Sequence, residues 1–203
     1  MLTDTVTPDL FSLFIALGCG YILGSIPSGL ILTKFFTGID IRETGSGNIG
    51  ATNVLRTGDK KLAIATLLLD AAKGAIPVLI FIDPIQLATF AAGGAVLGHI
   101  FPIWLKFKGG KGVATLLGSM IALSWPISII ALVTWIISAF VFRYSSLAAI
   151  IAIAVSATAS LFIAPTSVFI FTSIFGMFVV ICHHENITRL LAGTESKIGD
   201  KKK

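Results

Sequence analysis

Charged side chains are scarce in this sequence. Only 12% of its 203 residues are charged, whereas 55% are hydrophobic and the mean hydropathy is +0.96. So little charge excludes an ordinary soluble domain, in which about 25% of residues are charged. A helix needs about 20 mostly apolar residues to cross the hydrocarbon core of a bilayer. The composition therefore predicts an integral membrane protein.

Cysteine and histidine are scarce as well. Cys19 and Cys182 lie in the outer part of the first apolar stretch and at the inner end of the last, depths too different for a disulfide. They indicate nothing about the redox compartment, and no metal-binding spacing is present. With three histidines and few carboxylates, a zinc site is disfavoured. We expect neither a metal nor a cofactor.

Seven apolar stretches predict the helices of a single membrane domain covering residues 1–203. They span residues 10–34, 62–82, 85–105, 112–123, 125–142, 145–163 and 166–182. The fourth is short, so an alternative joins 112–142 into one kinked helix and leaves six spans. The first is too long for a cleaved signal peptide, and two acids but no base precede it.

The placement of basic residues separates these topologies. With seven spans, every Lys and Arg except Lys73 falls on one side, whereas six spans would divide them between both sides. The positive-inside tendency therefore favours seven. The other side then holds only Asp4, Asp9 and Asp83. This predicts an all-α protein with its N-terminus outside, its C-terminus cytoplasmic and a basic inner surface that faces anionic lipid.

The first polar motif, from Gly45 to Asn53 and followed by Arg56, is rich in glycine, hydroxyl and amide groups. Glycines let backbone N–H groups converge on an anion. Side chains such as Ser46, Asn48 and Asn53 can donate further hydrogen bonds, and the arginine fork matches phosphate oxygens. A plain turn needs far fewer residues of this kind. We therefore expect an anion-binding loop.

The second polar motif, Lys106 to Thr115, contains three lysines and three glycines. Its Lys111 and Gly112 directly precede a predicted helix, whose free N–H groups and dipole favour an anion. The nucleotide-binding pattern G-x-x-x-x-G-K-[ST] is absent, so nucleotide binding is not indicated. Topology alone would explain the lysines but not the glycine spacing.

The third polar motif ends the last span and contains His183, Asn186 and Arg189. On a continuing helix these side chains share one face. A histidine titrates near neutral pH and can take a proton from an alcohol or stabilise a phosphate. A polar helix end at the membrane interface explains this segment equally well. All three motifs fall on the inner side, which predicts one anion-binding site there.

Two charges and a histidine stand inside predicted spans. Asp70 and Lys73 lie near the middle of the second span, where charges are unfavourable and normally paired or functional. Their spacing favours an intrahelical ion pair over a direct role with substrate. His99, followed by Pro102, is interpreted as a polar group in helix packing. The small residues 24–29 predict a kink in the first span.

These motifs resemble those of the bacterial acyl-phosphate:glycerol-3-phosphate acyltransferase (PlsY) family. The match extends over essentially the whole chain. It includes GSGNIGATN-x-x-R from Gly45, KGGKGVAT from Lys108, and H-x-x-N-I-x-R-L from His183, followed by Gly193 and Glu195.

The resemblance implies seven helices in the bacterial inner membrane, with the active site on the cytoplasmic face. It also implies that a fatty acyl group moves from acyl phosphate to the 1-hydroxyl of glycerol 3-phosphate, giving lysophosphatidic acid and phosphate, the first step of phospholipid synthesis. The implied partners are these two substrates, membrane lipid and, as a further candidate, the enzyme that makes acyl phosphate. No nucleic acid is expected.

The resemblance further implies roles for individual residues. Acyl phosphate is already activated, and no Ser-His-Asp ordering suggests an acyl-enzyme. His183 and Asn186 are expected to orient the attacking hydroxyl, whose proton goes to His183 or to substrate phosphate. The residues expected to hold the two phosphates are Ser46, Asn48, Arg56, Lys108, Lys111 and Ser146.

Other functions fit less well. No aspartate stands five residues after a histidine, which argues against the His-x-x-x-x-Asp acyltransferases, and aspartates are too few for a CDP-alcohol phosphotransferase. A transporter of phosphorylated metabolites also suits the helices and loops, but transport sites lie near the midplane. Only Asp70 and Lys73, which lie near the middle of a span, favour a transporter. A purely structural protein would leave the three motifs unexplained.

Overall fold

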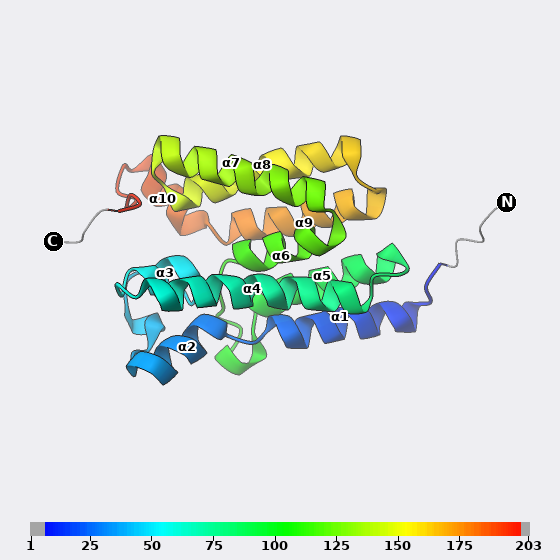
Figure 1. Cartoon of the computed structure of the whole chain (residues 1–203), viewed down its shortest axis with the longest axis horizontal. Coiled ribbons are helices and arrows are strands. Elements are labelled where there is room, and N and C mark those ends of the chain that lie inside the picture. The colour runs from blue at the N-terminus through cyan, green and yellow to red at the C-terminus, as the bar shows by residue number, and fades with distance from the viewer. Residues whose placement is uncertain (1–6, 200–203) are drawn as a thin grey trace. The chain divides into compact units, whose positions relative to one another are not determined.

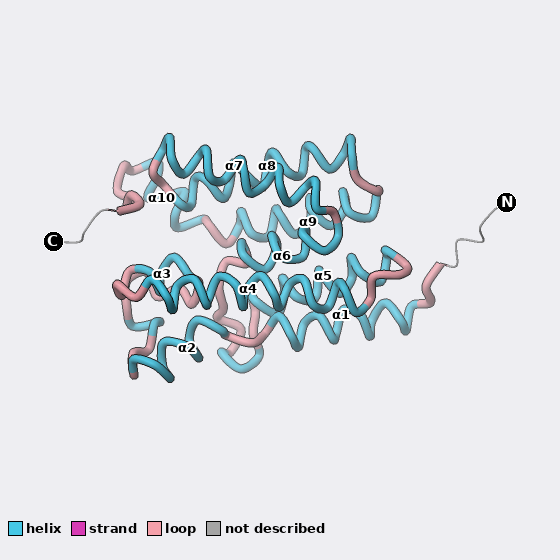
Figure 2. Tube along the Cα trace, in the orientation of Figure 1, coloured by secondary structure: helices cyan, strands magenta, loops and turns pink. Residues whose placement is uncertain are grey.

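The computed structural model describes residues 7–199, and every regular element within this range is a helix (Figures 1 and 2). The chain forms two compact units, which divide between Leu123 and Ser124. The all-helical prediction is confirmed. The prediction of one acyltransferase domain over the whole chain stays a prediction.

The first unit contains six α-helices and two short 3₁₀ helices. The α-helices are α1 (Leu10–Gly24), α2 (Ser28–Thr37), α3 (Ala51–Leu55), α4 (Lys60–Ile80), α5 (Ile85–Ile100) and α6 (Val113–Leu123). The 3₁₀ helices are η1 (Ile41–Glu43) and η2 (Ile103–Leu105). Helix α1 packs along α5, and α4 packs against both α5 and α6.

Small residues allow α1 and α5 to approach closely. A Cβ added to Gly20 or Gly24 would collide with the backbone of α5, and one added to Gly94 or Gly98 would collide with the backbone of α1. Apolar side chains gain little by leaving lipid for another helix, so close backbone packing is a main source of helix association in membranes. This contact is therefore built on glycine.

The predicted kink of the first span is a break. Helix α1 ends at Gly24 and α2 begins at Ser28, with Pro27 between them. Proline cannot donate a backbone hydrogen bond, and carbonyls left unpaired inside a membrane need another partner. At this break the carbonyl of Ile26 accepts from the N–H of Ser28 at 3.0 Å and from Nζ of Lys73 in α4 at 2.7 Å.

The second unit contains α7 (Trp125–Phe142), α8 (Ser145–Ile163), α9 (Thr166–Ile181) and α10 (His184–Leu191). Helix α8 packs between α7 and α9. A buried hydrogen bond of 2.7 Å joins the Ser160 and Thr172 hydroxyls of α8 and α9. The last span ends before the third polar motif, because α9 and α10 are bent by 60° relative to each other.

The described helices confirm a multi-pass membrane protein. Five segments are long and apolar enough to cross a bilayer: Leu10–Thr37, Lys60–Ile80, Ile85–Leu105, Trp125–Phe142 and Ser145–Ile163. Counting α9 and α10 as one bent span gives a sixth. The apolar helix α6 has 11 residues and is shorter than a full span. Residues 112–142 do not form one continuous helix, because Ser124 between α6 and α7 is extended, and the count of seven spans stays a prediction.

Candidate active site

Asn53 organises the first polar loop. Its side chain is buried, and its Nδ2 donates to the carbonyls of Ile41, Thr44 and Asn48 at 3.0, 2.9 and 2.8 Å. Its Oδ1 accepts from the backbone N–H of Ser46 at 3.0 Å. The expectation that Asn53 donates to an anion is wrong in this structure, because its amide protons already hold the loop together.

Backbone N–H groups of the same loop are also used internally. Those of Ser46, Gly47 and Gly50 bond within the loop at 2.8 to 3.0 Å. Gly45 and Gly47 have φ values of +61° and +71°, which favour glycine. A Cβ on Gly45 would lie 3.3 Å from Cδ of Arg56, so this side chain passes beside the loop. Anion binding here therefore depends on side chains more than on these N–H groups.

The two arginines near this loop differ in their partners. Arg42 donates to Asp40 from Nε at 2.9 Å and from Nη2 at 2.6 Å, a two-bond ion pair. These side-chain hydrogen bonds hold the pKa of Asp40 at about 2 and raise the pKa of Arg42. Arg56 is exposed at the end of α3. Its exposure and its place beside the loop make Arg56 a candidate for binding phosphate.

A hydrophobic cluster supports the first loop and connects it to the second. Its buried members come from α2, η1, the loop, α3 and α4: Leu30, Ile41, Ile49, Val54, Leu62 and Ala63. Leu105, at the end of η2, packs against this cluster. Leu105 directly precedes Lys106, so the second polar motif begins next to the hydrophobic cluster that supports the first loop.

The second loop folds back onto the end of α5. The N–H groups of Gly109 and Gly110 donate to the carbonyls of Ile100 and His99, both at 3.0 Å. A Cβ on Gly110 would collide with the imidazole of His99, and one on Gly109 with the carbonyl of His99. Glycine is therefore required at both positions for the loop to approach His99 closely. This explains the glycine spacing, which the positive-inside tendency did not.

The predicted position of Lys111 is confirmed. Helix α6 begins at Val113, and Gly112, with φ +85°, immediately precedes it. Lys108 is exposed and Lys111 is half-buried. Lys111 thus stands just before the N-terminus of α6, which suits an anion, whereas Lys108 lies further upstream in the loop.

The third polar motif lies in the second unit and does not continue the last span. Helix α9 ends at Ile181, and His183 is the N-cap of α10. The shared face considered for a continuing helix therefore does not include His183. His183 is buried, and its Nδ1 lies 2.7 Å from the carbonyl oxygen of Val179. A carbonyl only accepts, so Nδ1 carries a hydrogen, and in the neutral form of the ring the lone pair is on Nε2.

Glu195 connects three side chains of the second unit. Its Oε1 accepts from Ser146 Oγ at 2.7 Å and from Asn186 Nδ2 at 2.6 Å, and its Oε2 accepts from Arg189 Nε at 2.7 Å. Burial alone would raise the pKa of Glu195, but the hydrogen bonds from Arg189, Ser146 and Asn186 outweigh it and lower the pKa. The carboxylate is therefore ionised near neutral pH.

The segment after α10 is held against the start of α8. The N–H of Ile198 donates to the carbonyl of Arg143 at 2.6 Å, and Arg143 Nη2 donates to the carbonyl of Ile198 at 3.1 Å. The ammonium of Lys197 lies 5.8 Å from the ring centre of Tyr144, within range of a cation–π interaction. The segment that contains Glu195 is thus held by α10 before it and by these contacts to Arg143 and Tyr144 after it.

The structure places the predicted site residues in two groups. The first unit holds Ser46, Asn48, Arg56, Lys108 and Lys111, and the second holds Ser146, His183 and Asn186. Sequence reasoning assigned no role to Glu195, although this carboxylate closely follows the third motif. The only signal available was its place in the family pattern.

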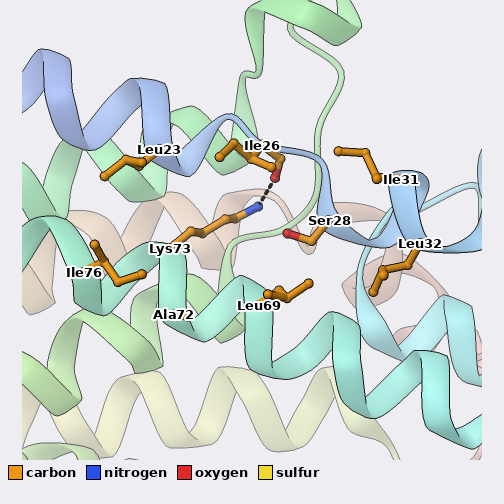
Figure 3. A pocket seen from close by; sticks show the side chains of 9 residues that line it. All are labelled: Leu23, Ile26, Ser28, Ile31, Leu32, Leu69, Ala72, Lys73 and Ile76. Carbon is orange, nitrogen blue, oxygen red and sulfur yellow. Dashed lines mark hydrogen bonds between the residues drawn. The ribbon is translucent and has the colours of Figure 1, made fainter.

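An apolar groove of about 260 Å³ lies between the first span and α4. It is lined by side chains such as Leu23, Leu32 and Leu69, with Ser28 and Lys73 as polar members (Figure 3). Figure 3 also shows Lys73 reaching across it to Ile26. Leu32 also packs against the hydrophobic cluster of the first loop, so groove and loop share a wall.

Comparisons with known proteins identify the family. The glycerol-3-phosphate acyltransferase family model matches residues 14–193. A glycerol-3-phosphate acyltransferase of Mesorhizobium japonicum is 53% identical over 94% of this chain and 98% of its own length. One from Rhodospirillum rubrum is 49% identical over 91% of this chain and 90% of its own.

Solved structures give the same result. The crystal structure of PlsY (YgiH), an integral membrane glycerol 3-phosphate acyltransferase, in its glycerol 3-phosphate form has a TM-score of 0.88 and 37% identity. Its lysophosphatidic acid form has a TM-score of 0.86. Each comparison covers 93% of this chain and 96% of the other. The chain belongs to the glycerol-3-phosphate acyltransferase family.

Proposed function

We propose that this enzyme transfers a fatty acyl group from acyl phosphate to the 1-hydroxyl of glycerol 3-phosphate. The products are 1-acyl-glycerol 3-phosphate (lysophosphatidic acid) and phosphate, and the reaction begins phospholipid synthesis. The observation that carries this proposal is the likeness to a structure that binds glycerol 3-phosphate and, in a second form, lysophosphatidic acid. These are the acceptor and the product of the reaction.

The phosphates of both substrates require cationic and hydrogen-bonding side chains. Arg56, Lys108 and Lys111 supply the charge, and Ser46 and Asn48 supply hydrogen bonds. Arg56 is exposed and passes beside the first loop, which supports it as the guanidinium that binds phosphate. In the second unit, Ser146 can bind a phosphate oxygen by exchanging its hydrogen bond to Glu195.

His183 and Asn186 orient the acceptor hydroxyl. Its oxygen attacks the acyl carbon, a new C–O bond forms, and the bond from that carbon to the phosphate oxygen breaks. Phosphate leaves, and the hydroxyl proton goes to His183 Nε2 or to a substrate phosphate. Because Val179 fixes Nδ1 as the protonated nitrogen, Nε2 is the atom able to receive it. Positioning and charge stabilisation then provide most of the rate enhancement.

The apolar groove receives part of the acyl chain. Ligand pockets have volumes of roughly 300–1,000 Å³, so a groove of about 260 Å³ holds only a portion of a long chain and leaves the rest in lipid. Its shared wall with the first loop supports this assignment, since the chain and its activated head group must lie close together.

The topology that serves this reaction has seven spans, with α6 as the short one, in the bacterial inner membrane. The N-terminus is outside, and the three polar motifs face the cytoplasm. Support comes from the basic residues, which share one side in this arrangement except for Lys73. A membrane-impermeant thiol reagent on intact cells should label an Asp83→Cys variant and spare a Lys60→Cys variant, and the reverse pattern would contradict the orientation.

The reaction is tested with purified protein in detergent, palmitoyl phosphate and glycerol 3-phosphate, without acyl-CoA or acyl carrier protein. We expect lysophosphatidic acid from the wild-type protein and little from Arg56→Ala or Lys111→Ala. No product from well-folded protein would reject acyl phosphate as the donor. Product formed only with a thioester donor would support glycerol 3-phosphate as the acceptor and show that the acyl donor is a thioester.

A further inference from the structure

Three buried polar side chains near the middle of the first unit have no role in the reaction described above. Asp70 and Lys73 of α4 form an ion pair of 2.8 Å, and their side chains are only 3% and 6% exposed. His99, near the end of α5, places Nδ1 3.8 Å from the same oxygen of Asp70 and is 4% exposed. An ionisable residue within a membrane span is by default a candidate for function.

Stability alone does not account for this cluster. A buried ion pair can often be replaced by apolar residues of similar volume without loss of stability, because desolvation offsets the attraction between the charges. We therefore look for a role of the Asp70–Lys73 ion pair that two apolar side chains could not fill. The contacts of its neighbours indicate what that is.

The upstream end of the second polar loop rests on His99. The His99 carbonyl accepts from the N–H of Gly110, and the imidazole packs directly on Gly110. Any shift of this ring, which lies beside Asp70, would therefore displace the residues between Lys108 and Lys111.

The downstream end of the same loop rests on α4, within one turn of the ion pair. A Cβ on Gly74 would collide with the carbonyl oxygen of Thr115, so α6 begins in direct contact with α4. Ser119 Oγ also donates to the carbonyl of Gly74 at 3.1 Å. Residues 70–74 thus support the loop at both ends.

The cluster is also tied to the break in the first span. Lys73 donates to the carbonyl of Ile26 at 2.7 Å. Trp104, in η2, donates from Nε1 to Ser25 Oγ at 2.8 Å. The break and the loop segment are therefore fixed to α4 and to each other, which leaves little freedom for the loop to move.

We propose that Asp70, Lys73 and His99 are positioning residues for acyl transfer, which hold Lys108 and Lys111 where these lysines bind substrate phosphate. None of the three takes part in the chemical step, although Lys73 lines the groove assigned to the acyl chain. The inference rests on the proposed function, since it assigns the cluster to a loop whose task is phosphate binding. Its failure is separate from failure of that function, because the wild-type protein would still be active.

The test replaces the pair with neutral groups of similar size in an Asp70→Asn/Lys73→Met double variant. We expect a folded protein with a melting temperature close to wild type and at least a tenfold lower kcat/KM, seen chiefly as a raised KM for one phosphate substrate. A matched control, Ser160→Ala/Thr172→Val, removes a buried interhelical hydrogen bond in the second unit and should leave kcat/KM unchanged. Wild-type kinetic constants in the folded double variant would overturn the proposal.

Two single variants decide the matter if the double variant does not fold. His99→Leu fills the space without a polar group, whereas His99→Gln restores polar atoms beside Asp70. We expect Leu to reduce kcat/KM at least tenfold at an unchanged melting temperature and Gln to recover most of the loss. Equal activity of the Leu variant and the wild type would show that the ring only fills space.

Discussion

Asn186 donates a 2.6 Å hydrogen bond to Glu195, nine residues later, across the turn that follows α10. The same carboxylate accepts from Ser146 and Arg189. Two predicted site residues, Ser146 and Asn186, are therefore positioned by one acid that lies outside the long motifs.

Replacing Glu195 with glutamine should weaken all three contacts. We expect Glu195→Gln to lower the free energy of unfolding by about 1–3 kcal/mol, the usual effect of impairing a buried hydrogen-bonding group. Acyl transfer should fall at least tenfold, because Asn186 loses its support. The measurements are thermal unfolding in detergent and the rate of lysophosphatidic acid formation. Wild-type values for both would contradict this role.

The same carboxylate predicts a pH dependence of stability. Its pKa is lower in the folded protein than in the unfolded chain, where a glutamate titrates at about 4.3. Its contribution is therefore complete above the unfolded pKa and is lost as the pH falls through the folded pKa. The difference in melting temperature between wild type and Glu195→Gln should be constant from pH 6 to 8 and shrink below about pH 4. A difference independent of pH would rule out ionic contacts as the cause.

Asn53 should be indispensable to the first loop. Asn53→Asp keeps the acceptor for Ser46 but removes the three hydrogen bonds donated to loop carbonyls. We expect the aspartate variant to lose acyl transfer as fully as Asn53→Ala, since neither can hold the loop. Steady-state rates of both variants test this, with Thr158→Ala on the surface of α8 as a control. Near-normal activity of the aspartate variant would show that the acceptor contact is sufficient.

Arg56 and Arg42 should differ in their effect on catalysis. Removing a charged donor to the reacting groups typically reduces the rate by about 10²-fold or more. We expect Arg56→Ala to show such a loss in kcat/KM, whereas Arg42→Ala, whose guanidinium already pairs with Asp40, should lose less than tenfold. Initial rates at varied concentrations of each substrate make the comparison. The opposite order would assign the phosphate contact to Arg42.

The glycine contact between α1 and α5 can be tested with a matched pair. A Cβ on Gly94 would collide with Leu17, whereas a Cβ on Gly18 meets nothing within 4 Å. Gly94→Ala should destabilise the protein by about 1–3 kcal/mol, as overpacking does. Gly18→Ala should be neutral or stabilising by up to about 1 kcal/mol, because alanine favours the helix. Melting temperatures of the two variants in one detergent provide the comparison.

Much of the fold follows from the sequence, because the length of an apolar run and the position of Gly and Pro set where a membrane helix begins and ends. The predicted bounds of 125–142 and 145–163 coincide with α7 and α8, and the small residues 24–29 mark the break between α1 and α2. The seventh span is not established, since α6 has the apolar character of a span but only 11 residues.

The site was less predictable, because its geometry depends on contacts between distant residues. Sequence pattern identified Lys111 at a helix start, but it did not reveal that Asn53 binds loop carbonyls or that the glycines at 109 and 110 pack on His99. The predicted end of the last span at residue 182 agrees with the end of α9 at Ile181, but composition does not show the bend that follows it. These features arise when separate elements meet.

The central claim is direct acyl transfer from acyl phosphate to glycerol 3-phosphate. The most direct test measures initial rates with both substrates varied and counts phosphate and lysophosphatidic acid released by the purified protein. We predict intersecting double-reciprocal lines, equal amounts of the two products and phosphate release that requires glycerol 3-phosphate. Parallel lines with a burst of phosphate in the absence of glycerol 3-phosphate would reveal an acyl-enzyme and contradict this account.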